Sequence, residues 1–190
     1  MSGSKDVAGN FPYFLQPIFS GNLSKQFFKL VSPLKNAQFK NGCMNISIPP
    51  EKIKEIAQEV EMGMLCYYHI KTGELETVPD ELKGHAGYEE QFWKDSLKKI
   101  KANRKQYICF EGMESYESFR MMETFVQNIT DANTRRHFQE TVALKKPFGH
   151  FKQSLYQYPV LQQQWYNFKD EQYVLYVQQQ LEAYNLESNS

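Results

Sequence analysis

The spacing of apolar residues changes from helical to strand-like and back to helical after Ile48. A first helix is predicted to begin near Glu51, because Pro49 and Pro50 suit the start of a helix and an acidic side chain is favourable there. Its apolar positions recur at intervals of three and four residues and end before Gly63: Ile53, Ile56, Ala57 and Val60. One face of this helix is therefore expected to be buried.

Two strands joined by a tight turn are predicted next. Residues 64–70 and 75–78 are rich in aromatic and aliphatic side chains, and Pro79 is expected to end the second strand. The turn at residues 71–74 contains Gly73, which is expected to supply a positive φ. Residues 107–110 predict a third strand.

Helical spacing dominates the remainder of the chain. The second half of segment 80–104 is predicted to be helical, and a strong helix begins near Ser115. Thr130 and Asp131 are expected to cap the next helix, which stops at Pro147. A short helix over residues 148–156 and, after Pro159, a long helix to about residue 184 follow. This order predicts an α+β fold: a small antiparallel sheet of about three strands packed against a mostly helical C-terminal half.

The last two helices carry apolar stripes that predict a helical hairpin with a buried interior. The stripe of the short helix is Phe148, Phe151 and Leu155, and that of the long helix begins with Leu161, Trp165 and Phe168. The long helix then resumes its stripe out of phase, at Val174, Val177, Leu181 and Tyr184. Such a helix must bend, or must bury its two halves against different partners.

The tyrosines between these stripes are the candidate binding residues. They are expected to point away from the hairpin interior and to form an outer surface with a neighbouring lysine: Tyr156, Tyr158, Tyr166, Tyr173, Tyr176 and Lys152. Tyrosine offers a large contact area at a small cost in conformational entropy, which favours it at interfaces. A partner-binding surface is therefore predicted on the C-terminal helices.

The chain is expected to divide into an extension and one domain. Residues 1–45 are predicted to be an irregular, aromatic-rich N-terminal extension, of which residues 1–10 are disordered, and residues 46–187 a single α+β domain. The aromatic residues of the extension are expected to pack on the domain, with one short helix around residues 24–31. The alternative is a flexible arm with exposed aromatic side chains.

Three ordered motifs resemble a bacterial uncharacterised protein family of small cytoplasmic proteins. They are a hairpin at Tyr67–Glu74, a helix with Tyr116, Met122-Glu123 and Phe125-Val126, and a C-terminal signature with Phe148, Phe151-Lys152, Tyr158-Pro159 and Trp165-Tyr166-x-Phe168-Lys169. The resemblance covers about residues 48–187, with His69 and Lys71 departing from the family pattern. It implies a shared α+β fold and no established reaction, so it assigns no catalytic residues.

Composition and charge exclude several classes of protein. The chain has a hydrophobic content of 41% and equal numbers of basic and acidic residues, 22 of each, so no overall field favours nucleic acid or anionic lipid. No apolar run approaches the length of about 18 residues typical of a membrane span. The three widely spaced cysteines, Cys43, Cys66 and Cys109, do not suggest a disulfide scaffold, which favours the cytoplasm.

No complete catalytic, metal or cofactor motif is recognisable. The four histidines lie on different predicted elements: His69, His85, His137 and His150. Cys66 and Cys109 fall inside predicted strands and are expected to be unreactive core thiols. No metal or cofactor is therefore expected, and an enzyme is the less favoured interpretation.

Acidic residues give the strongest enzymatic hypothesis, a hydrolase in which Glu111, Glu117 and Glu123 converge in one cleft. The alternative is that the acids at the start of the helix complement its dipole, with Glu123 in a structural ion pair. The candidate partners of Glu123 are Arg120, Arg135, Arg136 and Lys152.

A basic segment gives the nucleic-acid hypothesis. Its cations are Lys94, Lys98, Lys99, Lys101, Arg104 and Lys105, and nearby aromatic residues are Phe92, Trp93 and Tyr107. Lysines that bind phosphate beside aromatic rings that stack on bases are typical of RNA or single-stranded DNA binding. The alternative is a solvated helix face with Trp93 turned inward.

The leading hypothesis is a non-enzymatic cytoplasmic interaction or regulatory protein that uses its aromatic C-terminal helices. Its partner is an unknown protein or a second copy of itself. The balanced charge, the aromatic surplus and the lack of a catalytic motif favour this hypothesis over the nucleic-acid and hydrolase alternatives.

Overall fold

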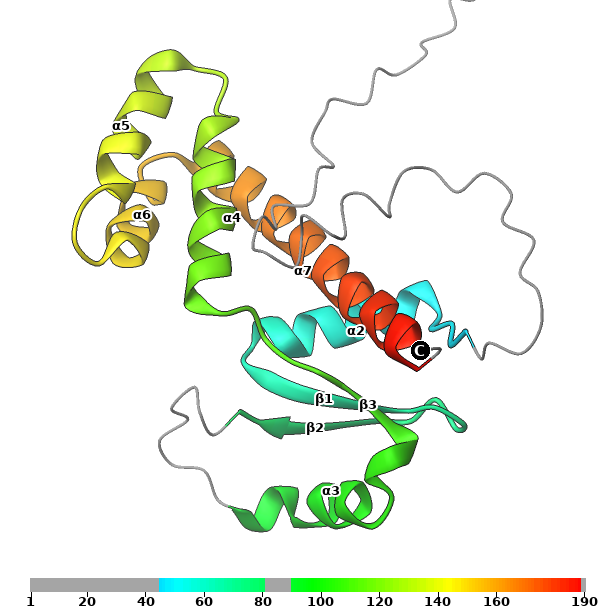
Figure 1. The fold of residues 1–190 in the computed structure, drawn as a ribbon. Coiled ribbons are helices and arrows are strands. Elements are labelled where there is room, and N and C mark those ends of the chain that lie inside the picture. Colours follow the sequence, from blue (N-terminus) through cyan, green and yellow to red (C-terminus); the bar gives the residue numbers. More distant parts are fainter. Residues whose placement is uncertain (1–44, 81–89, 189–190) are drawn as a thin grey trace, which may run out of the picture.

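The computed structural model describes residues 45–80 and 90–188 and has the predicted α+β fold (Figure 1). Its elements, in chain order, are α2 (Pro50–Glu61), β1 (Met64–His69), β2 (Leu75–Pro79), α3 (Glu90–Ala102), the 3-10 turn η2 (Arg104–Gln106), β3 (Tyr107–Phe110), α4 (Ser115–Gln127), α5 (Ala132–Val142), α6 (Pro147–Leu155) and α7 (Pro159–Glu187). The proposed extension at residues 1–45 and its short helix lie almost entirely outside the described residues. The same holds for His85 and Cys43.

The sheet is antiparallel, with strand order β2-β1-β3. Cys66 of the central strand pairs with Thr77 on one side and with Phe110 on the other. The hairpin turn is the predicted one, because Gly73 has a φ of 73°. Pro79 is the last residue of β2 rather than the residue after it. A proline is tolerated there because β2 is an edge strand and Pro79 stands at its end.

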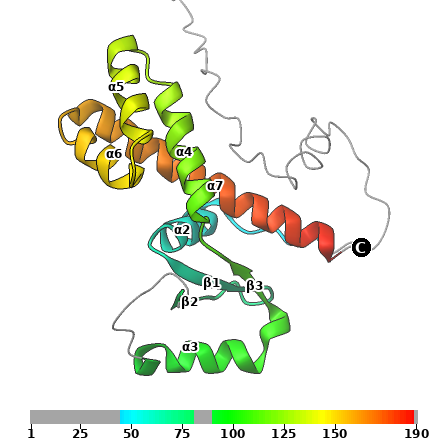
Figure 2. The ribbon, with the colours of Figure 1, turned by 60° about the vertical axis from the view of Figure 1, so that its left-hand side comes forward.

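Helices cover both faces of the sheet, as Figures 1 and 2 show. Helix α2 and the second half of α7 lie on one face, where the alternating strand residues Cys66 and Tyr68 are buried. Helix α3 lies across the opposite face. The first core cluster therefore sits between the sheet and the α2–α7 layer, and its central members are Ile56, Val60, Cys66, Phe110 and Val177.

A second core cluster fills a helical lobe made of α4, α5, α6 and the first half of α7. Phe125 of α4 is at its centre, with its ring centroid 5.1 Å from that of Trp165 and 5.6 Å from that of Phe168. Phe151 of α6 meets Phe125 and Trp165 edge-on. Such edge contacts contribute about 0.5–1.5 kcal/mol each beyond the area they bury.

Helix α7 belongs to both clusters and uses opposite faces to do so. Phe168 is buried in the helical lobe, whereas Val177 is buried against α2 and the sheet. Nine residues separate them, which at 3.6 residues per turn corresponds to about half a rotation around the helix axis. The out-of-phase stripe is thus explained by the second alternative: the two halves of the helix are buried against different partners.

Two side-chain amides of α7 bind backbone groups of distant segments. Gln180 accepts the N–H of Glu111 (2.9 Å) and donates to its carbonyl (3.0 Å). Asn185 does the same with Ile46, at 2.9 Å in both directions. Each side-chain amide therefore pairs with both the N–H and the carbonyl of one residue, as the backbone of a neighbouring strand would. These bonds hold two distant chain segments against the C-terminal half of α7.

The hairpin interior differs from the prediction at one position. Phe151, Leu155 and Phe168 are buried and Trp165 is half-buried, but Phe148 is 45% exposed. Helix α6 begins at Pro147, and Phe148 in its first turn meets only the edge of the lobe, 6.3 Å from the Phe119 ring. In addition, α5 ends at Val142, five residues before Pro147.

In the part of the chain that the structure describes, no helix has both the length and the apolar composition needed to cross a membrane.

Gln172 of α7 is buried without a hydrogen-bond partner among the described residues. It is 1% exposed and lies four residues after Phe168, on the face that enters the helical lobe. A buried polar group without a partner costs about 1–3 kcal/mol. We therefore expect Gln172→Met, which keeps the volume and removes the amide, to raise the free energy of unfolding by about 1–3 kcal/mol in urea titrations.

The matched control is Gln180→Met on the same helix. Because this change removes the two hydrogen bonds to Glu111, it is expected to lower the free energy of unfolding by about 1–2 kcal/mol. A loss of stability in both variants would show that the Gln172 amide is satisfied in solution.

Candidate interaction groove

An open groove of about 860 Å³ lies where the corner between α4 and α5 faces the first half of α7. We call it the α4–α7 groove. Its apolar lining comes from the end of α4 and the start of α7: Phe125, Ile129, Val160, Leu161 and Phe168. Its volume is in the range of natural ligand sites, about 300–1,000 Å³, but it is open along its length rather than enclosed.

The polar lining of the groove is acidic. It contains the carboxylates of Asp131 and Glu171, together with neutral amides and hydroxyls at Asn128, Thr134, Gln164 and Asn167, and no Lys, Arg or His lines it. Asp131 accepts the N–H of Thr134 at 2.7 Å, and this backbone hydrogen bond lowers the pKa of the Asp131 carboxyl. Asp131 therefore carries a negative charge at neutral pH.

Local sequence explains the shape of the corner. Helix α4 ends at Gln127, and Asp131 caps α5 as predicted, which leaves Ile129 in the bend. The carbonyl of Ile129 accepts a hydrogen bond from Nη1 of Arg135 at 2.9 Å, which holds the bend against α5. On the opposite side, Pro159 lies in the first turn of α7, where its missing N–H has no helical partner to lose.

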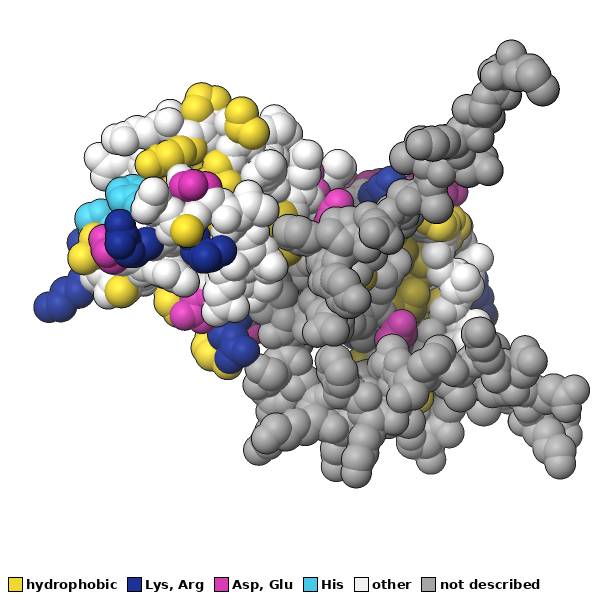
Figure 3. Space-filling model, turned by 90° about the horizontal axis from the view of Figure 1, so that it is seen from above, with side chains coloured by type: hydrophobic (Ala, Val, Ile, Leu, Met, Phe, Trp, Pro, Cys, Tyr) yellow, Lys and Arg dark blue, Asp and Glu magenta, His cyan; other side chains and the backbone are white. Residues whose placement is uncertain are grey.

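Apolar side chains remain exposed around the groove. Val160 in the first turn of α7 is 75% exposed, although helix starts commonly carry polar residues. Figure 3 shows hydrophobic side chains gathered at the end of the molecule that carries α5 and α6, with acidic, basic and histidine side chains around them. An exposed apolar patch rimmed by polar groups is typical of an interaction site.

The six predicted partner-binding residues do not form one surface. Tyr156, Tyr166 and Lys152 are exposed. Tyr158 lines the groove and is half-buried, with its ring 5.5 Å from that of Phe138. It is the only one of the six that the described structure places in the groove lining.

The expectation that Tyr173 and Tyr176 point outward was wrong, because both pack against the core. Tyr173 contacts both core clusters, and burial raises the pKa of its hydroxyl. The Tyr176 hydroxyl donates to the carbonyl of Gly112 at 3.4 Å, and its pKa is raised by burial and then by the nearby carboxylates of Glu117 and Glu111. Both tyrosines therefore stabilise the junction between the two halves of α7.

The three acids of the hydrolase hypothesis do not converge. Glu111 and Glu117 lie near Tyr176, and Glu117 forms a capping box with Glu114, accepting its N–H at 2.9 Å. Glu123 follows Glu117 by six residues on α4, about 240° around the helix. The acids at the start of α4 thus complement the helix terminus, as the alternative interpretation held.

Glu123 lacks the predicted ion pair. The ion pairs within the described residues join Lys52 to Glu55, Lys99 to Glu76 and Lys169 to Glu61, and Glu123 is half-buried. Of its predicted partners, Arg135 instead binds the carbonyl of Ile129.

The six cations of the basic segment point in different directions. Lys99 binds Glu76 of β2 at 2.6 Å, and the Arg104 guanidinium lies over the ring of Tyr67, 5.0 Å from its centroid. Lys94, Lys98 and Lys101 are exposed on a different face of α3, at intervals of four and three residues. Lys105 is also exposed.

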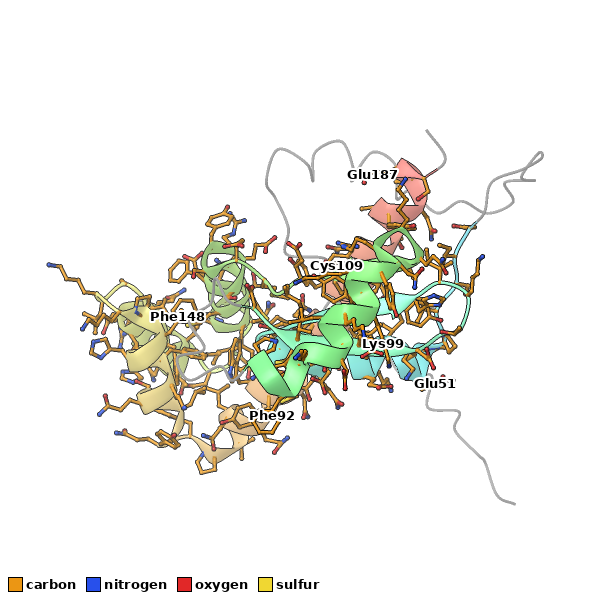
Figure 4. All side chains as sticks on the ribbon, turned by 90° about the horizontal axis from the view of Figure 1, so that it is seen from below. Glu51, Phe92, Lys99, Cys109, Phe148 and Glu187 are labelled. Carbon is orange, nitrogen blue, oxygen red and sulfur yellow. The ribbon has the colours of Figure 1, made fainter. Side chains whose placement is uncertain are left out.

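The aromatic residues near the basic segment also differ in their exposure to solvent. Trp93 is half-buried, whereas Phe92 is 78% exposed. Figure 4, viewed from below, shows α3 in front of the sheet, with Phe92 near one end of the helix and Lys99 farther along it. Tyr107 is buried in β3.

The described residues contain neither a reactive thiol nor a cluster of metal ligands. Burial raises the pKa of both the Cys66 and the Cys109 thiols, so they are protonated at neutral pH. No three His, Cys, Asp or Glu side chains among residues 45–80 and 90–188 converge as metal ligands would. His69 has a structural role: it accepts the Thr72 N–H in the hairpin turn at 3.1 Å.

The structure is that of a small α+β protein with a long shared helix and an open apolar groove at one end of it. The chain belongs to the Uncharacterised protein family (UPF0158), which matches residues 88–189. This range contains α3 to α7 and the whole groove, as well as the Tyr116 and C-terminal motifs, whereas the Tyr67–Glu74 hairpin precedes it. No curated protein and no solved structure matches the chain.

Sequence reasoning missed the groove because its residues look ordinary one by one. Asp131 was predicted as a helix cap, which it is, and Ile129 is one of many buried apolar residues. Val160 gave the only direct signal, as an apolar residue directly after the proline that starts α7 and outside its apolar stripe.

The contact between α3 and the sheet depends on Glu76, which is 9% exposed and binds Ser96 and Lys99, each at 2.6 Å. Burial alone would raise the pKa of Glu76, but these hydrogen bonds outweigh it and the pKa is lowered. The pKa of Lys99 is raised by the same contact. A lowered carboxyl pKa stabilises the fold above the unfolded value of about 4.3, and this contribution is lost as the pH falls through the folded pKa.

A raised lysine pKa contributes stability that is lost when the pH rises above about 10.4. We therefore expect Glu76→Gln to lower the free energy of unfolding by about 1 kcal/mol at pH 7, with the difference from wild type vanishing towards pH 3. Chemical denaturation from pH 3 to 8 measures it. Glu55→Gln, in the exposed pair with Lys52, is the control and should have almost no effect. A constant difference at all pH values would contradict the assignment.

Proposed function

We propose that this protein is a non-enzymatic interaction or regulatory protein of the cytoplasm and that the α4–α7 groove binds its partner. The observation that carries this proposal is the lining of the groove, which combines an apolar floor with two carboxylates and no cation. A partner segment that fits this lining has apolar side chains on one face and Lys or Arg beside them. Amphipathic helices that lay an apolar face into a groove are a recurrent mode of recognition.

The dimensions of the groove suit such a segment. Its lining on α7 runs from Tyr158 to Glu171, which at 1.5 Å per residue is about 20 Å of helix. A partner helix of three to four turns has this length. The open form of the groove favours a segment of polypeptide over a small molecule, which natural sites bury on most sides.

The charges favour a basic partner. Asp131 and Glu171 line the groove from different elements, one at the start of α5 and the other on α7. A cation near either carboxylate would be attracted, whereas an acidic segment would be repelled. Charge complementarity of this kind contributes to specificity more than to affinity.

Fluorescence polarisation with labelled amphipathic peptides tests the proposal. We expect a peptide with a Leu-rich face and Lys or Arg on its flanks to bind at least tenfold more tightly than the same peptide with Glu at those positions. Because Trp165 packs on Phe125 and Phe168, which line the groove, its emission in a Trp93→Phe protein gives a second signal.

Two matched variants locate the binding site. Val160→Glu places a charge in the groove, and Leu144→Glu makes the same kind of change at a position that is 53% exposed on another part of the lobe. Val160→Glu is expected to weaken binding of the amphipathic peptide at least tenfold, and Leu144→Glu to leave peptide binding unchanged. Equal binding by all three proteins would exclude the groove.

Nucleic-acid binding is the second candidate function, and it is favoured by the shared face of Lys94, Lys98 and Lys101. Three phosphate contacts to a single strand give a salt exponent of about −2. A fourfold rise in salt is then expected to weaken binding of an RNA or DNA oligonucleotide about 20-fold. Electrophoretic mobility shifts with the Lys94→Gln/Lys98→Gln/Lys101→Gln variant as control measure this. Salt-independent binding, or binding by the variant, would contradict it.

A further inference from the structure

The N-terminal segment has the composition that the groove calls for. Residues 11–44 contain no Asp or Glu and four lysines, Lys25, Lys29, Lys35 and Lys40. They also hold six of the chain's phenylalanines: Phe11, Phe14, Phe19, Phe27, Phe28 and Phe39. An apolar and purely basic segment matches an apolar groove whose charged lining residues, Asp131 and Glu171, are both acidic.

The point where this segment joins the domain lets it reach the groove. Asn185 binds both backbone polar groups of Ile46, so the chain leaves the described structure beside the C-terminal end of α7. The groove lies at the other end of the same helix, and Leu161 is 24 positions before Asn185, about 36 Å along the axis. About 11 extended residues span that distance, so residues before about position 34 can reach the groove.

We propose that residues 11–34 bind in the α4–α7 groove of the same chain and compete there with the partner. This inference rests on the proposed function, since both assign the same groove to a basic apolar segment. The N-terminal segment is then an intramolecular ligand that keeps the groove closed to weak partners. A partner must bind more tightly than the tethered segment to displace it.

Tethering sets the strength of this competition. A short tether gives an effective concentration on the order of 1 mM. If the segment alone binds with a Kd of about 0.1 mM, about nine molecules in ten are closed. The apparent affinity for an external peptide is then reduced about tenfold, and removing the competing side chains restores it.

Limited trypsin digestion of the full-length protein, read by mass spectrometry, tests the docking itself. Initial cleavage after Lys25 and Lys29 is expected to be about tenfold faster in Val160→Glu than in wild type, because the groove no longer holds the segment. Leu144→Glu is expected to match wild type. Equal rates in all three proteins would overturn the proposal, and so would a protection that depends on protein concentration, since the segment would then come from a second copy.

Binding of the basic amphipathic peptide tests the competition. In full-length protein with serine in place of the five phenylalanines between positions 11 and 34, we expect the peptide to bind about tenfold more tightly than to wild type. Peptide binding of equal strength in both proteins would overturn this inference and leave the proposed function standing. Groove-dependent protection from trypsin without peptide binding to either protein would support the docking and overturn the external partner.

Discussion

The two apolar faces of α7 are the constraint on which the rest of the structure depends. Phe168 and Val177 point in opposite directions from one helix, and each is buried in a different core cluster. Neither the sheet layer nor the helical lobe has a complete core without its half of α7. Gln180 and Asn185 add polar connections from the same helix to segments far away in the sequence. Helix α7 extends past the sheet into the lobe, as Figure 2 shows. The groove forms there, between the first half of α7 and the corner of α4 and α5.

Local patterns in the sequence predicted most of the fold. The helix start at Pro50, the positive φ of Gly73 and the cap at Asp131 each depend on neighbouring residues, and all three were predicted. The surface was harder to predict, since helical spacing places Tyr176 outside the apolar stripe of residues 174–184. Because α7 is buried on two faces, the face opposite one stripe is not the exposed one, and Tyr176 packs inward.

The candidate site could be predicted less well, for a physical reason. A groove arises from the relative position of helices, and Ile129 and Val160 are thirty-one residues apart in the chain. The types and spacing of single residues in a sequence carry no measure of that relative position. The cations of α3 illustrate the same limit, because Lys99 finds Glu76 only after α3 has packed on the sheet.

The shared helix also fixes the length of its own middle section. A single residue inserted between Phe168 and Val177 would rotate one half of α7 by about 100° relative to the other and shift it by about 1.5 Å. One of the two cores would then receive the wrong side chains. Insertions are commonly tolerated in surface loops, but here the phase of a helix links two packing surfaces. The number of residues between Phe168 and Val177 is therefore constrained by both cores at once.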